Sequence, residues 1–319
     1  MLNGTDDISK FTGGIPFAKP ATGAQIIWNA RVGRPIKVFD GTSDQVAVYP
    51  NGNSERYRNR LMGELPIATQ KDIPVGFDIT SLGEANQQIL IYYEVIEPAR
   101  KKGERAVIHE PLNEAKYDRK VWVYVPSLKR VKRAPEAAYD TPVGPGGLLT
   151  ADDNVGFNGA LDRYNWTIVG KQEMIVPFHN YGFDDPKLTQ EDLLLKTHVN
   201  PKHLRFEQRR VWVVEATLKP GKRHVYAKRR FYVEEDSWTI VAVERYDGRN
   251  QLWRIGLQTS VYNYFIKAYT PRVFISYDLD AGAYIASGLV NQTKPTNYDV
   301  EPRGAAFYTS THLRKRGIK

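Results

Sequence analysis

The 319-residue sequence contains no cysteine, which excludes disulfides, thiolate metal sites and cysteine nucleophiles. It also lacks any apolar run near the roughly 18 residues that a membrane-spanning helix needs. Residues 1–10 are polar and have no apolar signal-peptide core, so they are predicted to be a disordered lead. An N-terminal export signal is therefore expected to be absent from this chain.

Motifs for metal or nucleophilic chemistry are also missing. The six histidines are scattered, and His198 and His203 flank Pro201 rather than forming the i, i+4 helical pair of a zinc hydrolase. No G-x-S-x-G elbow and no phosphate-binding G-x-x-x-x-G-K loop occurs. The sequence therefore predicts no metal site, no cofactor and no catalytic residue.

One acidic cluster needs separate treatment. Asp152, Asp153 and Asn154 are residue types found in calcium loops. An EF-hand, however, needs a ligand and then a glycine where this chain has Gly156 and Phe157. A cluster of polar turn residues is the simpler interpretation.

The formal net charge is +9, with basic clusters at residues 129–133, 228–230 and 314–316. Binding to nucleic acid would need basic residues interleaved with exposed aromatics across a sheet face. Only one predicted strand, residues 226–232, alternates in this way. We therefore expect no nucleic-acid partner and place most Lys and Arg at hairpin turns and sheet edges.

The sequence does contain many strand signals, which are densest from residue 204 to residue 290. Pro220-Gly221 predicts a type II turn, and Asp247-Gly248 is a hairpin signal. No segment between the turns has a sustained helical period. The predicted strands here are 204–218, 223–233, 238–246, 251–266, 273–279 and 284–290.

The N-terminal half follows the same pattern more loosely. Strands are predicted at 46–49, 87–96, 105–109 and 166–176, with a hairpin over 119–133, whereas 51–60 is expected to be an exposed polar segment. Short helices are predicted at 25–30, 158–164, 189–196 and 309–319. Residues 121–125 are apolar on both faces, so this strand should be covered twice or line a hollow.

Tryptophans suggest where that hollow lies, because most of them fall in predicted strands. A large apolar sheet with few helices has to curl to bury its own face, and partly closed barrels leave a cavity for an apolar ligand. The residues predicted to line it are Trp122, Tyr124, Trp212, Val214, Phe231, Trp253 and Ile255.

Several stretches resemble a bacterial family of uncharacterised proteins related to outer-membrane lipoprotein-sorting proteins. They are residues 11–17, 121–135, 139–142, 152–166 and 227–254, so the likeness runs from about residue 11 to the end. The wider group is similar to the periplasmic carriers LolA and LolB, which have a half-barrel antiparallel sheet with helices over its mouth and carry acyl chains.

The resemblance implies a mainly β (α+β) fold, in which residues 11–319 form one domain with a large curved antiparallel sheet, a half-open barrel and a few short helices. It also implies a periplasmic location. Family members usually carry an export signal and a further region before the Phe-Thr-Gly-Gly stretch, which here begins at Phe11. Its implied partners are a lipid or other hydrophobic small molecule, and a membrane transporter or outer-membrane protein.

Three functions remain open from the sequence. The first is a non-enzymatic periplasmic carrier or binding protein for a hydrophobic ligand, linked to outer-membrane biogenesis or transport. The second is an envelope assembly or scaffold protein that docks to membrane partners. The third is a hydrolase-type enzyme acting on an apolar substrate through Asp152, Asp153 or His179.

Overall fold

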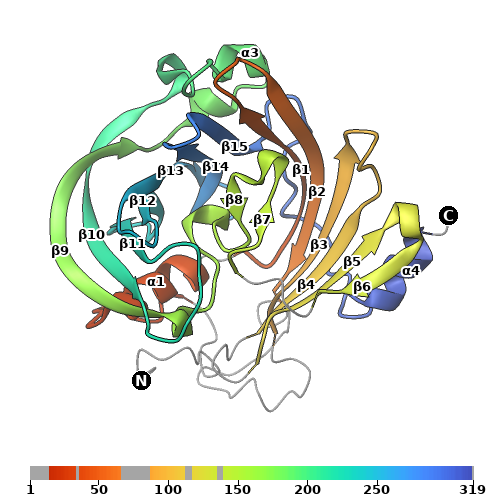
Figure 1. Ribbon diagram of the computed structural model, residues 1–319, viewed down its shortest axis with the longest axis horizontal. Helices are drawn as coiled ribbons and strands as arrows, with labels where there is room; N and C mark the ends of the chain where they lie inside the picture. Colours follow the sequence, from red (N-terminus) through yellow and green to blue (C-terminus); the bar gives the residue numbers. More distant parts are fainter. Residues whose placement is uncertain (1–13, 34–35, 66–86, 112–116, 135–138, 318–319) are drawn as a thin grey trace.

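The computed structural model describes residues 14–33, 36–65, 87–111, 117–134 and 139–317, so the lead predicted at residues 1–10 lies outside the described residues. One antiparallel sheet dominates and curls on itself without closing into a barrel (Figure 1). Its strand order is β6-β5-β4-β3-β2-β1-β15-β14-β13-β12-β11-β10-β9. The mainly β, half-open fold predicted from the sequence is confirmed.

The strands of this sheet are β1 (Val38–Val48), β2 (Ser54–Glu64), β3 (Gln87–Glu97), β4 (Arg105–Pro111), β5 (Lys120–Val125), β6 (Arg130–Arg133), β9 (Tyr164–Pro177), β10 (Phe206–Leu218), β11 (Lys228–Glu234), β12 (Ile240–Tyr246), β13 (Leu252–Asn263), β14 (Ala268–Asp278) and β15 (Ala283–Leu289). A separate hairpin consists of β7 (Pro142–Val143) and β8 (Leu149–Thr150). The α-helices are α1 (Gly23–Val32), α3 (Gln190–Leu193) and α4 (Ser310–Gly317). Single 3-10 turns occur at Pro126–Leu128, Pro145–Gly147, Asn154–Gly156, Leu161–Arg163, Tyr181–Asp184 and Pro201–His203.

The chain builds the sheet from the middle. Strands β1 to β6 run outward to one edge, and β9 to β15 return from the other edge until β15 pairs with β1. Between them, residues 139–163 cross the inside of the curl (Figure 1). We call this crossing segment the plug, β9–β15 with β1 the half-barrel, and β2–β6 the wing.

Local chemistry explains many of the boundaries. Gly221 has φ +77°, and the Lys222 amide donates to the Lys219 carbonyl at 3.1 Å, as the predicted type II turn requires. Thr189 and Asp192 cap α3 reciprocally, although this helix ends sooner than predicted. No helix in the described parts of the chain is long and apolar enough to cross a membrane.

The prediction of an exposed polar segment at residues 51–60 was wrong for most of its length, because β2 occupies it. Arg58 lies beside Asp44 and Arg60 beside Asp40 on the neighbouring strand, with N–O distances of 2.8 and 2.7 Å. The polar character of this strand comes from a cross-strand ladder of ion pairs.

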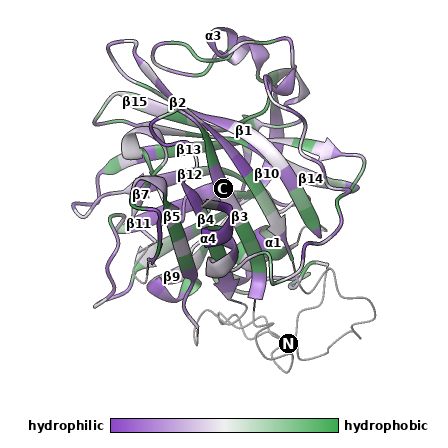
Figure 2. Ribbon diagram, turned by 90° about the vertical axis from the view of Figure 1, so that its right-hand side faces the viewer, coloured by the Kyte–Doolittle hydropathy of each residue, from purple (hydrophilic) through white to green (hydrophobic). Residues whose placement is uncertain are grey.

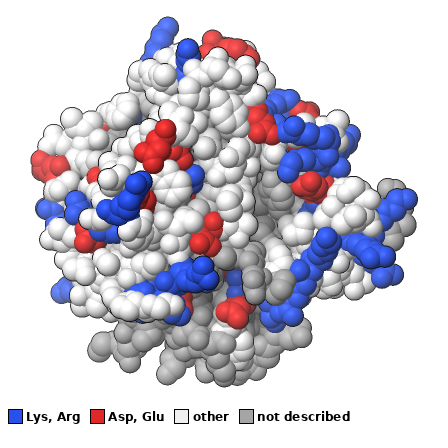
Figure 3. Space-filling model, viewed as in Figure 1, with Lys and Arg blue, Asp and Glu red and all other residues white. Residues whose placement is uncertain are grey.

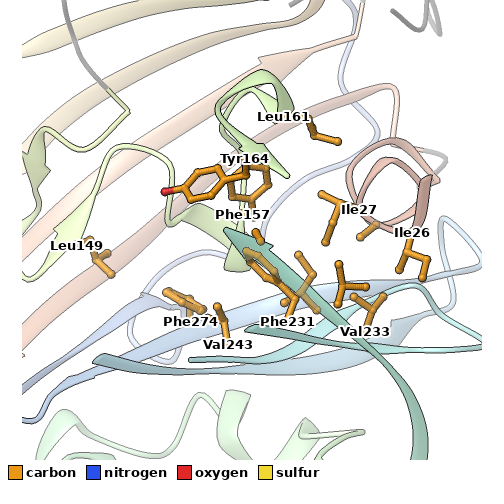
Figure 4. Close-up of a cluster of buried hydrophobic side chains, with 14 of the residues drawn as sticks. Ile26, Ile27, Leu149, Phe157, Leu161, Tyr164, Phe231, Val233, Val243 and Phe274 are labelled. Atoms are coloured by element: carbon orange, nitrogen blue, oxygen red, sulfur yellow. The ribbon is translucent and has the colours of Figure 1, made fainter. Parts of the chain in front are cut away.

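The two parts of the sheet are covered on opposite faces. In the half-barrel, Ile26 and Ile27 of α1 and Phe157 and Leu161 of the plug pack on the inner face, which is the face inside the curl (Figure 4). In the wing, α4 lies on the outer face, across β4, β5 and β6 (Figure 2). The plug and α1 therefore cover the inner face of the half-barrel, whereas α4 covers the outer face of the wing.

Candidate functional site

Three of the residues predicted to line a ligand cavity meet inside the half-barrel. Val214 of β10 pairs with Phe231 of β11, both side chains are fully buried, and Trp212 packs against the same cluster half-buried. Helix α1 and the plug fill the space beside them, so this interior is occupied rather than vacant. Contact of these residues with a ligand stays a prediction, and it would require the plug or α1 to move.

The other four predicted residues lie elsewhere. Trp122 and Tyr124 belong to the outer cluster of the wing, together with Leu313 of α4. Trp253 is half-buried, and its indole nitrogen donates to Asp278 at 3.2 Å. Ile255 pairs with Tyr277, which packs against the outer cluster of the half-barrel. The seven side chains therefore do not form one common surface.

Two aspartates of the plug form buried ion pairs with β11 and β12 of the half-barrel. Asp152 accepts from the Arg229 guanidinium at 2.8 Å and lies 3.3 Å from the His224 Nε2 atom. Asp153 lies 3.1 Å from the Nε atom of Arg245. All five side chains are almost completely buried. Interpreting these aspartates as a cluster of turn residues was therefore incomplete, because both carboxylates are buried in ion pairs.

A second layer of polar contacts surrounds the Asp153 pair. The Tyr226 hydroxyl donates to Asp153 at 3.1 Å and accepts from Arg254 at 3.1 Å. Arg254 in turn donates to Asp278 at 2.8 Å. Arg245 of β12 thus has Asp153 beside it and Arg254 of β13 has Asp278 beside it, so each of these cations has a carboxylate partner, which offsets much of the cost of burying them.

Burial and pairing act in opposite directions on these groups. Burial by itself would raise the pKa of Asp152, but the Arg229 charge and the hydrogen bond from His224 outweigh it and hold that pKa well below its ordinary value. Burial, and then the nearby charge of Asp153, raise the pKa of Tyr226 to about 12. Asp152 and Arg229 are therefore both charged around neutral pH, whereas Tyr226 is neutral.

Arg229 was missed because it belongs to a basic run that was interpreted as surface charge. A weak signal was present, since Arg229 alternates with Phe231 and Val233, whose side chains are buried in the half-barrel core. Nothing in the sequence of β11 alone identifies Asp152 as its partner, because the two residues are 77 positions apart.

His179, which the enzyme hypothesis invoked, bonds Glu207 at 2.8 Å and the Tyr269 hydroxyl at 3.0 Å. Asp152 and Asp153 contact other groups, among them Arg229 and Tyr226. Within the described ranges, no group of three or more His, Asp or Glu side chains could hold a metal ion.

Two hollows of the described chain lie away from the tryptophans. One is an open groove of about 640 Å³ at hairpin tips, lined by residues such as Glu55, Arg56 and Arg100. The other, near Gln190 and Leu289, holds about 10 Å³, which is too small for an organic ligand.

The inner face of the wing is the remaining apolar surface. Ala47 belongs to the half-barrel cluster, so alternation along β1 also places Gly41 on the inner face. Gly41 pairs with Leu61 of β2, and residues paired across neighbouring strands lie on the same face of a sheet. The inner face can therefore be followed from β2 to β5 through the strand pairing. Half-buried apolar side chains on it are Phe39, Leu61, Ile91, Tyr93, Ala106, Ile108, Val123 and Val125.

This apolar face ends in positive charge at the open edge of the sheet. Val123 pairs with Lys132 and Val125 pairs with Arg130, so both cations share the inner face, and both are exposed. Lys and Arg side chains gather over this end of the wing (Figure 3). An apolar surface beside two exposed cations is suited to an amphiphile with an anionic head.

Comparison with solved structures defines the class of the fold. The chain is similar to a LolA superfamily protein from Nitrosomonas europaea (TM-score 0.55, 13% identity, 92% of this chain and 100% of that one). It is also similar to a putative outer membrane lipoprotein-sorting protein domain from Vibrio parahaemolyticus (TM-score 0.56, 14% identity, 86% and 91%). This chain therefore shares the fold of these two proteins.

The family is defined more narrowly by sequence. Residues 1–314 match the family described as "Protein of unknown function (DUF1329)", and the chain belongs to this family. The uncharacterised protein PA3922 of Pseudomonas aeruginosa is 33% identical over 332 residues, covering 100% of this chain and 69% of that protein. A DUF1329 family protein from Desulfovibrio piger has a TM-score of 0.58 at 13% identity, covering 87% and 92%.

Proposed function

We propose that this protein is a non-enzymatic carrier or binding protein for a lipid-like amphiphile in the bacterial periplasm, linked to outer-membrane biogenesis or transport. The observation that carries this proposal is the half-buried apolar row on the inner face of the wing, which leads to Lys132 and Arg130. The LolA-type fold and the lipoprotein-sorting name of one structural neighbour support it.

The physical role of the wing would be to remove an acyl chain from water. Each buried methylene contributes about 0.8 kcal/mol, so a chain of about 10 carbons provides useful affinity. The strip from Leu61 to Val123 offers apolar contacts, and Lys132 offers a charge to a carboxylate or phosphate head. Chemistry on the ligand is not needed for this role, and a membrane transporter or outer-membrane protein is the partner class for ligand transfer.

Titration with a fluorescent fatty acid tests the proposal. Val123→Asp places a negative charge on the strip, next to Lys132, and should weaken binding at least about 10-fold, which corresponds to about 1.4 kcal/mol. Val169→Asp, at an exposed site on the edge strand β9, is the matched control and should bind like the wild type.

Two results would contradict the proposal. One is a wild-type protein that binds no fatty acid and retains no extractable lipid after purification. The other is equal weakening by Val123→Asp and Val169→Asp. A stable protein partner captured without any lipid would instead favour the scaffold role.

A further inference from the structure

The turn between β13 and β14 exposes two large aromatic side chains. Tyr264 is 76% exposed and Phe265 is 64% exposed, which puts them among the three most exposed large apolar side chains in the described residues. Exposing this much aromatic surface is unfavourable in water, and such residues often mark an interaction site.

This turn is held in place by specific contacts. The Asn263 side chain accepts from the Phe265 amide at 3.0 Å, and Lys267 closes the turn in the left-handed region with φ +53°. Below it, the Tyr181 hydroxyl donates to the Tyr262 carbonyl at 3.0 Å and accepts from the Tyr262 amide at 3.1 Å. The two aromatic rings are thus presented by a braced turn rather than a loose one.

A ring contact extends this support. The Tyr262 ring packs edge-on against both Tyr264 and Tyr269, with centroid distances of 5.1 and 5.3 Å. The Tyr264 ring is therefore supported by the Tyr262 ring, whereas the ring of the neighbouring Phe265 lies largely in solvent. The side of the turn facing away from the sheet is aromatic.

Charge and shape indicate the kind of partner. Between Thr259 and Val273 the hairpin has no acidic residue. Lys267 is exposed, whereas Arg272 is ion-paired with Asp184 at 2.6 Å. A tight turn of this kind is too small for the roughly 800 Å² that each partner buries in a stable protein interface. Insertion at lipid headgroup depth needs only a few amphipathic rings with cations beside them.

We propose that the β13–β14 turn is a membrane-docking element, which inserts Tyr264 and Phe265 into the headgroup region of an anionic lipid bilayer. Lys267, which is exposed in the same turn, contacts the lipid phosphates. Docking of this kind is separate from ligand binding by the wing and does not depend on it.

Vesicle flotation with phosphatidylglycerol–phosphatidylcholine vesicles tests this proposal on the whole chain. The double variant Tyr264→Ser/Phe265→Ser should lose at least 10-fold in vesicle affinity, whereas Phe265→Trp should retain binding. The matched control is Val169→Ser/Leu279→Ser, which removes two exposed apolar side chains elsewhere and should change affinity less than 2-fold. Binding to pure phosphatidylcholine vesicles should be weaker for the wild type.

Three outcomes would overturn it. The wild type could fail to bind either vesicle, the turn variant could bind as tightly as the wild type, or the turn and control variants could lose affinity equally. A protein partner that depends on Tyr264 and Phe265, with vesicle binding unchanged, would reassign the turn to a protein interface.

Discussion

The half-barrel and the wing are parts of the same sheet, yet they are covered on opposite faces. The half-barrel buries its inner face under α1 and the plug and fixes the plug with buried ion pairs. The wing buries its outer face under α4 and leaves half-buried apolar side chains inside. From this difference we expect the half-barrel to be the more stable part of the sheet, and the proposed ligand surface lies on the wing.

The largest effect should come from releasing the plug. Asp152→Asn leaves Arg229 buried without its counter-charge, which should lower the free energy of unfolding by about 3–5 kcal/mol. Asp162→Asn, also in the plug, disrupts only a surface pair with Lys222 and should cost less than about 1 kcal/mol. Chemical denaturation measures both, and equal losses would show that the buried pair does not secure the half-barrel.

A slightly smaller loss should follow from uncovering the wing. Leu313 of α4 is fully buried in the cluster between this helix and the wing, so Leu313→Ala should cost about 2–4 kcal/mol. Hydrogen exchange should show faster opening in β4 and β5 while β11 and β12 remain protected. The exposed Leu279→Ala serves as the control, and uniform acceleration across the sheet would contradict separate behaviour of the two parts.

Acid should weaken the half-barrel before the wing. The pKa of Asp152 is lower in the folded state than in the unfolded state, so its contribution is complete above the unfolded value of about 4 and is lost as the pH falls below it. Each unit of this shift corresponds to about 1.4 kcal/mol. The stability of Asp152→Asn should therefore depend less on pH between 5 and 2, which urea titrations at several pH values would detect.

The smallest effect compares one substitution in both parts. A Cβ atom at Gly256 would lie 2.6 Å from the Phe274 ring and 2.7 Å from the Val243 side chain, so Gly256→Ala should cost about 1–3 kcal/mol through overpacking. At Gly63 the three atoms nearest to the Cβ all belong to the Phe39 ring, on the half-buried inner face of the wing.

Because that ring can move aside, Gly63→Ala should cost less than about 1 kcal/mol. Thermal melts of the two variants give the comparison. A larger loss at Gly63 than at Gly256 would mean that the inner face of the wing is as tightly packed as the interior of the half-barrel.

Sequence patterns predicted the strands and turns well, because Pro220-Gly221 and similar signals act locally. They also placed Trp212, Val214 and Phe231 on one face, since adjacent antiparallel strands keep that alternation. Trp122 and Tyr124 could not be assigned in this way. Both faces of β5 are apolar, so the pattern does not show on which face these two side chains pack. The helix α4, which covers them on the outer face, comes almost 190 residues later in the chain.

The ion pairs of the plug could not be predicted from local sequence either. Asp152 and Arg229 each look like ordinary polar surface residues in their own segments, and only the fold brings them together. Burial of an ion pair depends on both partners, so no single window of sequence contains the signal. The apolar inner strip of the wing was likewise missed, because β2 was not expected to be a strand.

The pairing of β15 with β1 has a consequence for synthesis on the ribosome. Val46 of β1 pairs with Ala286 of β15, so the β1–β15 seam of the sheet joins residues that are 240 positions apart. Such non-local pairing makes folding slow, and the nascent chain carries an unsatisfied strand edge until Ala283–Leu289 have emerged. A chain that stops before residue 283 would leave that seam open and be prone to aggregate through β1.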